Sequence, residues 1–353
     1  MKVQNSTQVK GITHQGGYYQ QKPSNDTFWS MSMPLILDVP IQKSREDNMM
    51  GSMSERVCFF GACTESDLTT EPGRITMIDG DVLAMPVSTH YFHFVYETAS
   101  MLESLHMHGI LHKLSNSTLL CFGEEPTASN KDMLDVLGIP PLPAKIIKGK
   151  PNVWYQATGK TIVPSFNNYH VHQDPYKSYN QWIFSSIRSR LPRITHPHRA
   201  LFLSRKGVRR AIRAEAEIYD KLKTTFLPHL ENIVPHHYNL TEQATMFAAA
   251  NLIISAHGAA LTNLIFSDWN QVTVIEITPE LRPATFRNDL QIQHHYLLTC
   301  PSFSDDSKDL WDLDMDCHVD QTVNVIQHIL IHDINATQEE ISTTHSIPES
   351  PKN

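Results

Sequence analysis

One stretch of the sequence, residues 251–277, restricts the fold more than any other, because it reads as strand, turn, helix and strand. The apolar runs at residues 251–254 and 272–277 have the length and composition of buried strands. Between them, a turn with one glycine, Gly258, opens an apolar segment of helical character. A strand, a short glycine-containing turn, a helix and a second strand form half of a doubly wound nucleotide-binding unit.

The turn of this unit predicts a site for a phosphate-bearing ligand. The side chains at Gly258, Ala259 and Ala260 are small enough to let a large anion approach their backbone N–H groups. The helix dipole favours negative charge at the same place. The pattern leaves open which phosphate compound binds there.

Strand and helix patterns alternate through the second half of the chain. Strands are expected at residues 200–204 and 233–234, and helices at 214–225 and 241–250, the last with Thr241 as its N-cap. Regular alternation implies a mostly parallel sheet covered on both faces. The sequence therefore predicts an α/β fold.

The first half carries similar patterns, separated by prolines. A long helix is predicted at residues 90–114 and a short one at 132–137. Strands are predicted at residues 57–61, 74–78, 118–122, 146–147, 153–155 and 161–163.

Length and local composition divide the chain into two domains. The 353 residues suffice for two domains of ordinary size, and a basic, proline-containing stretch at 189–199 is chosen as their linker. The expected parts are a flexible segment at 1–30, a first domain at 31–190, a second at 191–317, a helix at 318–335 that packs across both domains, and a disordered tail at 336–353.

Composition argues against nucleic-acid binding and membrane insertion. The formal net charge is −8, so no broad basic surface exists to neutralise nucleic-acid phosphates. The first 30 residues hold neither the apolar core of a signal peptide nor a membrane span. We therefore expect a soluble, cytoplasmic protein, or a protein of the secretory-pathway lumen if the sequence is part of a longer chain. The oligomeric state is left open.

The five cysteines do not suggest a disulfide framework. They are odd in number and irregularly spaced, and no C-x-x-C pair occurs, so neither structural zinc nor disulfides are predicted. A local Cys58–Cys63 bridge is the alternative for a secreted protein. Otherwise buried free thiols are expected at Cys58, Cys63, Cys121, Cys300 and Cys317.

A basic turn follows the strand predicted at residues 200–204. Ser204 leads directly into Arg205, and Arg209 and Arg210 follow after a glycine-containing turn. Ligands of open α/β sheets bind beyond the carboxyl ends of the strands, and the guanidinium fork can hold two phosphate oxygens at once. A solvated basic loop is the alternative. Together with the turn at Gly258, however, the arginines favour a clamp for a diphosphate.

Glu276 lies near the carboxyl end of a predicted buried strand, where a charge is costly unless it is paired. We expect it to contact the ribose or the donor, or to pair with one of the arginines.

Candidate acid–base groups lie in the first half. On the predicted helix, His93 and Glu97 are one turn apart in a polar stripe with Ser100 and Ser104, and could bind a hydroxyl or move its proton. A surface ion pair is the alternative.

Asp79 and Asp81 follow a predicted strand; they are turn formers by default and also candidates for a general base. His90, His93 and Glu97 superficially resemble a metal set without the H-E-x-x-H arrangement, and Asp312, Asp314 and Asp316 are interpreted as a solvated stretch.

Together these motifs resemble glycosyltransferase family 61, which includes plant β-xylosyltransferases and animal O-linked and O-mannosyl N-acetylglucosaminyltransferases. The resemblance spans about residues 90–280. It is carried by Tyr91-Phe92-His93-Phe94 with Glu97, Ser204-Arg205-Lys206-Gly207 with Arg209-Arg210, Leu240-Thr241-Glu242-Gln243-Ala244, His257-Gly258-Ala259-Ala260-Leu261-Thr262-Asn263 and Val274-Ile275-Glu276.

The resemblance implies a GT-B architecture, in which two Rossmann-like domains face an interdomain cleft. The first domain would bind a glycan or glycoprotein acceptor and supply a base from among Asp79, Asp81, His93 and Glu97. The second would bind a UDP-sugar, with xylose as first choice and N-acetylglucosamine as second, and inversion would give a β-linkage. Donor contacts are expected from Ser204, Arg205, Arg209, Arg210, His257, Gly258, Ala259, Ala260, Thr262, Asn263 and Glu276.

No metal ion or other cofactor is expected, because fixed cations and dipoles can stabilise the leaving diphosphate. The rival hypothesis is a catalytically silent nucleotide- or carbohydrate-binding module, which would keep the Gly258 turn without a base.

Overall fold

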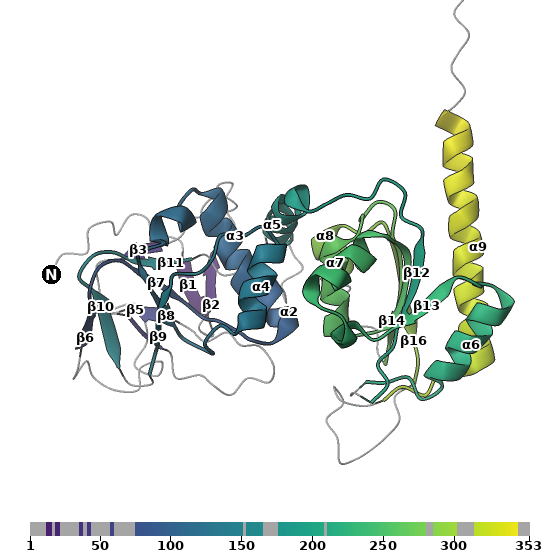
Figure 1. Ribbon diagram of the computed structural model, residues 1–353, viewed down its shortest axis with the longest axis horizontal. Coiled ribbons are helices and arrows are strands. Elements are labelled where there is room, and N and C mark those ends of the chain that lie inside the picture. Colours follow the sequence, from purple (N-terminus) through teal and green to yellow (C-terminus); the bar gives the residue numbers. More distant parts are fainter. Residues whose placement is uncertain are drawn as a thin grey trace, which may run out of the picture. The chain divides into compact units, whose positions relative to one another are not determined.

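The computed structural model describes residues 12–15, 18–21, 35–37, 41–43, 57–59, 75–150, 153–164, 176–207, 210–279, 285–301 and 314–344 (Figure 1). The chain forms two compact units. The first comprises Met1–Pro192 with Asn288–Gln291, and the second comprises Arg193–Arg287 with Ile292–Asn353.

The first unit contains a five-stranded sheet in the order β3-β11-β7-β8-β9, in which the last four strands are parallel. Its strands are β3 (Leu35–Leu37), β11 (Thr161–Val163), β7 (Val82–Met85), β8 (Thr118–Cys121) and β9 (Lys145–Lys148). A second sheet has the order β5-β4-β10-β6, formed by β5 (Val57–Phe59), β4 (Ile41–Lys43), β10 (Trp154–Ala157) and β6 (Ile75–Ile78).

A hairpin of β1 (Ile12–Gln15) and β2 (Tyr18–Gln21) lies within the segment predicted to be flexible. The flexible-segment prediction is wrong for these strands. The Gly16-Gly17 dipeptide between them in the sequence is a hairpin signal that the polar composition obscured.

The helix predicted at residues 90–114 exists, but its geometry differs from a regular α-helix. It runs from α2 (Tyr91–His93) through a π-helical turn, η1 (Phe94–Ala99), into α3 (Ser100–Met107), and a separate 3₁₀ turn, η2, covers Leu111–Leu114. The expected polar stripe is buried: Glu97, Ser100 and Ser104 are at most 3% exposed. Helix α3 packs against the unpredicted α5 (Tyr176–Arg190), where Arg190 and the buried Glu103 form a two-pronged ion pair.

The second unit is a parallel five-stranded sheet in the order β13-β12-β14-β15-β16. Its strands are β12 (Arg199–Leu203), β13 (Leu230–Ile233), β14 (Ala250–Ala256), β15 (Thr273–Thr278) and β16 (His294–Thr299). Helix α7 (Leu240–Ala248) lies on one face, and α6 (Glu215–Thr225) packs with α9 (Val319–Thr344) on the other (Figure 1). The prediction of an α/β fold with parallel sheets is confirmed; the GT-B arrangement stays a prediction.

The shorter helical elements complete the fold. They are α4 (Ala128–Val136), η3 (Pro235–His237), η4 (Ala259–Phe266) and α8 (Thr285–Leu290). Helix α9 is longer than predicted and continues to Thr344, so residues 336–344 belong to a helix rather than a disordered tail. Its buried residues Val323, Ile326 and Leu330 pack in the core of the second unit. Packing across both domains stays a prediction.

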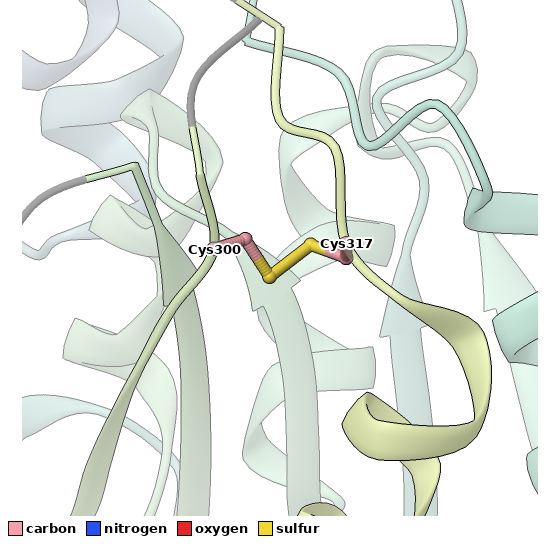
Figure 2. The surroundings of a disulfide bond; sticks show 2 residues. All are labelled: Cys300 and Cys317. Atoms are coloured by element: carbon pink, nitrogen blue, oxygen red, sulfur yellow. A yellow bond between two sulfur atoms is a disulfide. The ribbon is translucent and has the colours of Figure 1, made fainter.

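One disulfide contradicts the expectation of free thiols. Cys300 at the end of β16 is bonded to Cys317 just before α9, with their Cα atoms 5.1 Å apart (Figure 2). A bridge between two elements that meet only in the folded chain leaves no spacing signal in the sequence. Cys121 is a buried free thiol, as predicted. Cys63 and the Cys58 side chain lie outside the described residues.

The N-cap of α7 is Asn239 rather than the predicted Thr241. The Asn239 side chain accepts from the backbone N–H of Glu242, and the Glu242 carboxylate accepts from the N–H of Asn239, which completes a capping box. Thr241 already lies inside the helix.

Replacing the cap tests this assignment. We expect Asn239→Ala to lower the free energy of unfolding by about 1 kcal/mol, because it orphans a helical N–H group. Thr241→Ala is the matched control and should change stability by less than half of that. Urea unfolding of non-glycosylated protein measures both, since Asn239 heads a glycosylation sequon. A larger loss of unfolding free energy in the Thr241 variant would indicate that Thr241 is the N-cap.

Candidate functional site

Three neighbouring parallel strands of the second unit bring the predicted donor residues to one edge. Ser204 and Arg205 follow β12, His257 and Gly258 follow β14, and Glu276 lies near the end of β15. The strand register aligns Leu203 with Ser255 and Ser255 with Glu276. The carboxyl edge of this sheet is therefore the candidate donor site.

The Arg205 guanidinium lies directly against Gly258. A Cβ atom added to Gly258 would lie 1.5 Å from Nη1 and 2.7 Å from Cζ of Arg205. The φ of Gly258 is 167°, an extended conformation open to any residue, so the space is what requires glycine here. The two motifs that the sequence suggested as phosphate contacts thus meet.

A buried glutamate that the sequence did not suggest holds the end of β12. The Glu215 carboxylate, in the first turn of α6, accepts from the backbone N–H of Arg205 at 2.9 Å and from the Ser204 hydroxyl. The Ser204 hydroxyl therefore donates its proton to a hydrogen bond inside the protein. The only hint in the sequence was an acidic residue at a helix start close to a basic turn.

The basic turn continues with two residues in left-handed conformations, Gly207 (φ 83°) and Arg210 (φ 62°). Residues other than glycine rarely adopt such a φ, so the surrounding structure must hold the backbone of Arg210 in this conformation. The following residues supply that support, since Ile212 pairs with Met315 and the N–H of Ala211 donates to Asp314 at 3.0 Å. Arg209 and Asp312 lie outside the described residues.

Glu276 joins two histidines. Its Oε1 accepts from Nδ1 of His257, and its Oε2 lies 2.8 Å from Nε2 of His295. Burial alone would raise the pKa of Glu276, but the hydrogen bonds from both histidines lower it to about 2. The carboxylate is therefore ionised and is hydrogen-bonded by two histidines. A contact of Glu276 with the ribose or the donor stays a prediction.

In the first unit, His93 and Glu97 form the pair that the sequence suggested, with Nδ1 and Oε1 2.8 Å apart. Glu97 is buried and not a surface residue. A π-helical turn such as η1 often marks a functional site. The pair follows the carboxyl end of β7.

Glu124 follows the neighbouring β8 and was not predicted. It accepts from the backbone N–H of Thr89, just before the helix, at 2.7 Å. Hydrogen bonds from Thr89 lower the pKa of Glu124.

Asp79 and Asp81 follow the carboxyl end of β6 and precede the amino end of β7, whereas His93 and Glu97 follow the carboxyl end of β7. The two aspartates occupy the corner at which β6 continues into β7, beside the corner between β10 and β11. Asp81 accepts from the N–H of Lys160 at 2.8 Å, and Asp79 accepts from the Thr158 hydroxyl at 3.1 Å. The structure does not bring them together with His93 and Glu97.

A comparison with protein families identifies the group. The model of glycosyltransferase 61 matches residues 91–275. The chain belongs to glycosyltransferase family 61. The suggested resemblance is thereby confirmed, and with it a glycosyltransferase activity. No curated protein matches the chain.

The family match includes His93, Arg205 and Gly258 but ends just before Glu276. Two further predicted donor contacts of this family 61 chain, Thr262 and Asn263, are fully buried. Asn263 donates to Gln243 of α7 at 2.8 Å. The helix that holds them, η4, is a 3₁₀ helix with Gly258 at its N-cap, and Ala259 and Ala260 in its first turn stay partly exposed.

In the described part of this family 61 chain, no group of three or more His, Cys, Asp or Glu side chains is arranged to hold a metal ion. Among the same residues, no helix has the length and apolar character needed to cross a bilayer.

Proposed function

We propose that this family 61 glycosyltransferase transfers a sugar, with xylose favoured, from a UDP-sugar to a hydroxyl of a glycan or glycoprotein acceptor. The reaction inverts the anomeric carbon and forms a β-linkage. The observation that carries the proposal is the Arg205 guanidinium seated on Gly258 at the carboxyl edge of a parallel sheet. That edge is where open α/β sheets bind their ligands.

The chemistry of the donor fits these groups. A departing UDP carries the negative charge that develops in the transition state, and a fixed guanidinium beside a bare glycine can approach its phosphate oxygens closely. We therefore assign Arg205, Gly258, Ala259, Ala260 and His257 to the diphosphate, with catalysis independent of a metal ion. Arg209 and Arg210 are further candidates, whereas buried Thr262 and Asn263 support the turn.

The acceptor hydroxyl must lose its proton as it attacks. We assign that task to His93, held by Glu97, because the helix that carries this pair follows the carboxyl end of β7. Asp79 and Asp81 are assigned to the strand corner that they hydrogen-bond.

The donor assignment is tested by UDP binding. We expect Arg205→Ala to weaken UDP affinity by 10- to 150-fold, about 1.5–3 kcal/mol for a charge-assisted contact. Lys206→Ala is the matched control, because it removes the same charge from an exposed position in the same turn, and it should change affinity less than about threefold. Calorimetric titration measures both affinities. Equal affinities for the Arg205 and Lys206 variants would contradict the site.

Gly258→Ala tests the close approach itself. The added methyl group has no room beside Arg205, whose flexible end must move away. We expect UDP affinity to fall tenfold or more while the circular dichroism spectrum stays unchanged.

Thermal-shift comparison of UDP-xylose with UDP-N-acetylglucosamine, UDP-glucose and a GDP-sugar then decides the donor, since bound ligand raises apparent stability. A larger shift with UDP-N-acetylglucosamine would replace xylose by that sugar.

A further inference from the structure

We propose that His295, which lies outside the region matched by the family model, is a positioning residue of the donor site. Its buried imidazole holds the Glu276 carboxylate, and Glu276 in turn holds His257 with its proton on Nδ1 and its Nε2 atom directed to the ligand. The inference rests on the proposed donor site.

The three side chains form a chain of contacts across three elements. His295 comes from β16, Glu276 from β15 and His257 from the turn after β14. Exposure rises along this chain, because the side chains of His295 and Glu276 are 0% and 4% exposed and that of His257 is 22% exposed. Of the three, only His257 can touch a ligand. Any influence of His295 on the donor must therefore pass through Glu276.

The hydrogen-bond chemistry determines where the protons lie. An ionised carboxylate only accepts hydrogen bonds, so the nitrogen that faces each oxygen of Glu276 must carry a proton. His257 is thus protonated on Nδ1, and Nε2 is the nitrogen that remains for the ligand. The same logic orients catalytic histidines that are held by a buried carboxylate.

His295 contacts Glu276 through one of its two ring nitrogens. Its Nε2 faces Glu276, while its buried Nδ1 has no hydrogen-bond partner among the described residues. A proton on that second nitrogen would be a buried donor without an acceptor, which is costly. His295 therefore donates to Glu276 through Nε2, and His257 is the member of the chain of contacts that lies at the carboxyl edge of the sheet.

The charged groups around His257 are Glu276 on β15 and Arg205, which lies against the adjacent Gly258 at the end of β12. His295 on β16 is the remaining titratable group of the chain of contacts. A carboxylate held at both oxygens cannot rotate away from His257. Without His295, one oxygen of a buried charge loses its donor and Glu276 is free to reorient.

Two variants of His295 separate positioning from simple packing. His295→Leu replaces the imidazole by an apolar side chain that has no hydrogen-bond donor. His295→Gln keeps an N–H donor on a side chain of similar length. We expect the leucine variant to weaken UDP affinity about tenfold, the size of effect typical of groups that orient a ligating side chain. The glutamine variant should recover affinity to within threefold of the wild type. His294→Leu is the control, because side chains of adjacent strand residues face opposite sides of the sheet.

Imidazole ¹⁵N spectra provide the readout that packing alone would not move. In the wild type we expect His257 to be protonated on Nδ1, with this signature kept in His295→Gln and lost in His295→Leu. An unprotonated Nδ1 in the wild type would overturn the inference without any variant, even if His295→Leu fails to fold. Unchanged UDP affinity and unchanged His257 signals in a folded leucine variant would also overturn it. The donor site itself stands or falls separately, by the Arg205→Ala titration.

Discussion

Replacing Glu97 by glutamine is expected to lower kcat by two to four orders of magnitude, the contribution of a positioned general base. The Glu97 carboxylate lies 2.8 Å from Nδ1 of His93 and is buried beneath it. An ionised carboxylate keeps the His93 proton on Nδ1 and stabilises the imidazolium that forms when Nε2 takes the acceptor proton. The amide of glutamine has the same shape but no negative charge. Helix geometry should therefore survive, while the charge that stabilises the imidazolium is lost.

The measurement is UDP release from UDP-xylose with a panel of oligosaccharide acceptors. His93→Ala should lose as much activity as Glu97→Gln, and both variants should bind UDP as the wild type does, because UDP is assigned to the other unit.

Asp79→Asn and Asp81→Asn are the matched controls for charge. These residues accept hydrogen bonds within the strand corner, so we expect kcat within about threefold of the wild type and a stability loss of about 1 kcal/mol. Loss of turnover in the aspartate variants but not in Glu97→Gln would move the base to the corner. Normal turnover in all four variants would refute a base from this set.

The meeting of Arg205 and Gly258 at the candidate donor site could be predicted from the sequence because each motif is local to one strand end. Each motif follows a strand directly, as Arg205 follows β12 and Gly258 follows β14. Parallel strands place their carboxyl ends at one edge of the sheet. Two strand predictions were therefore enough to expect that the arginine and the glycine would meet.

The aspartates show the effect of one unrecognised strand. Residues 82–85 form β7, but they are few and were not recognised as a strand. Asp79 and Asp81 were expected only to follow a strand, whereas they lie in the corner between β6 and β7. Their role as a base stays a prediction, which the asparagine variants test.

His295 and the disulfide could not have been predicted because they depend on pairing between distant segments. His295 reaches Glu276 only because β16 pairs with β15 in a register that aligns His295 with Val274. Glu215 reaches Ser204 through the return of α6 to the end of β12. Neither register nor helix return is encoded in local spacing. The buried polar side chains of a site are for this reason its least predictable part.

Removing the Cys300–Cys317 disulfide is expected to lower the free energy of unfolding of the second unit by about 3 kcal/mol. The bridge closes a loop with a sequence separation of 17 residues, and opening it returns that loop's freedom to the unfolded chain. The Cys300→Ser/Cys317→Ser variant and dithiothreitol-treated wild type should unfold at the same lower urea concentration. Dithiothreitol should leave the double variant unchanged. An identical midpoint for oxidised and reduced wild type would contradict the prediction.

Loss of the disulfide should also affect the basic turn that carries Arg205 and Arg210. Next to Cys317, Met315 and the chain around Ile212 exchange backbone hydrogen bonds, the N–H of Met315 to Ala211 and that of Arg213 to Met315, at 2.9 and 3.0 Å. This pairing begins directly after Arg210, whose left-handed conformation depends on its surroundings. We therefore expect faster hydrogen exchange at Arg213 and Met315 and a UDP affinity reduced severalfold in the double-serine variant. Faster exchange with unchanged affinity would show that the basic turn keeps its conformation without the pairing of Ile212 with Met315.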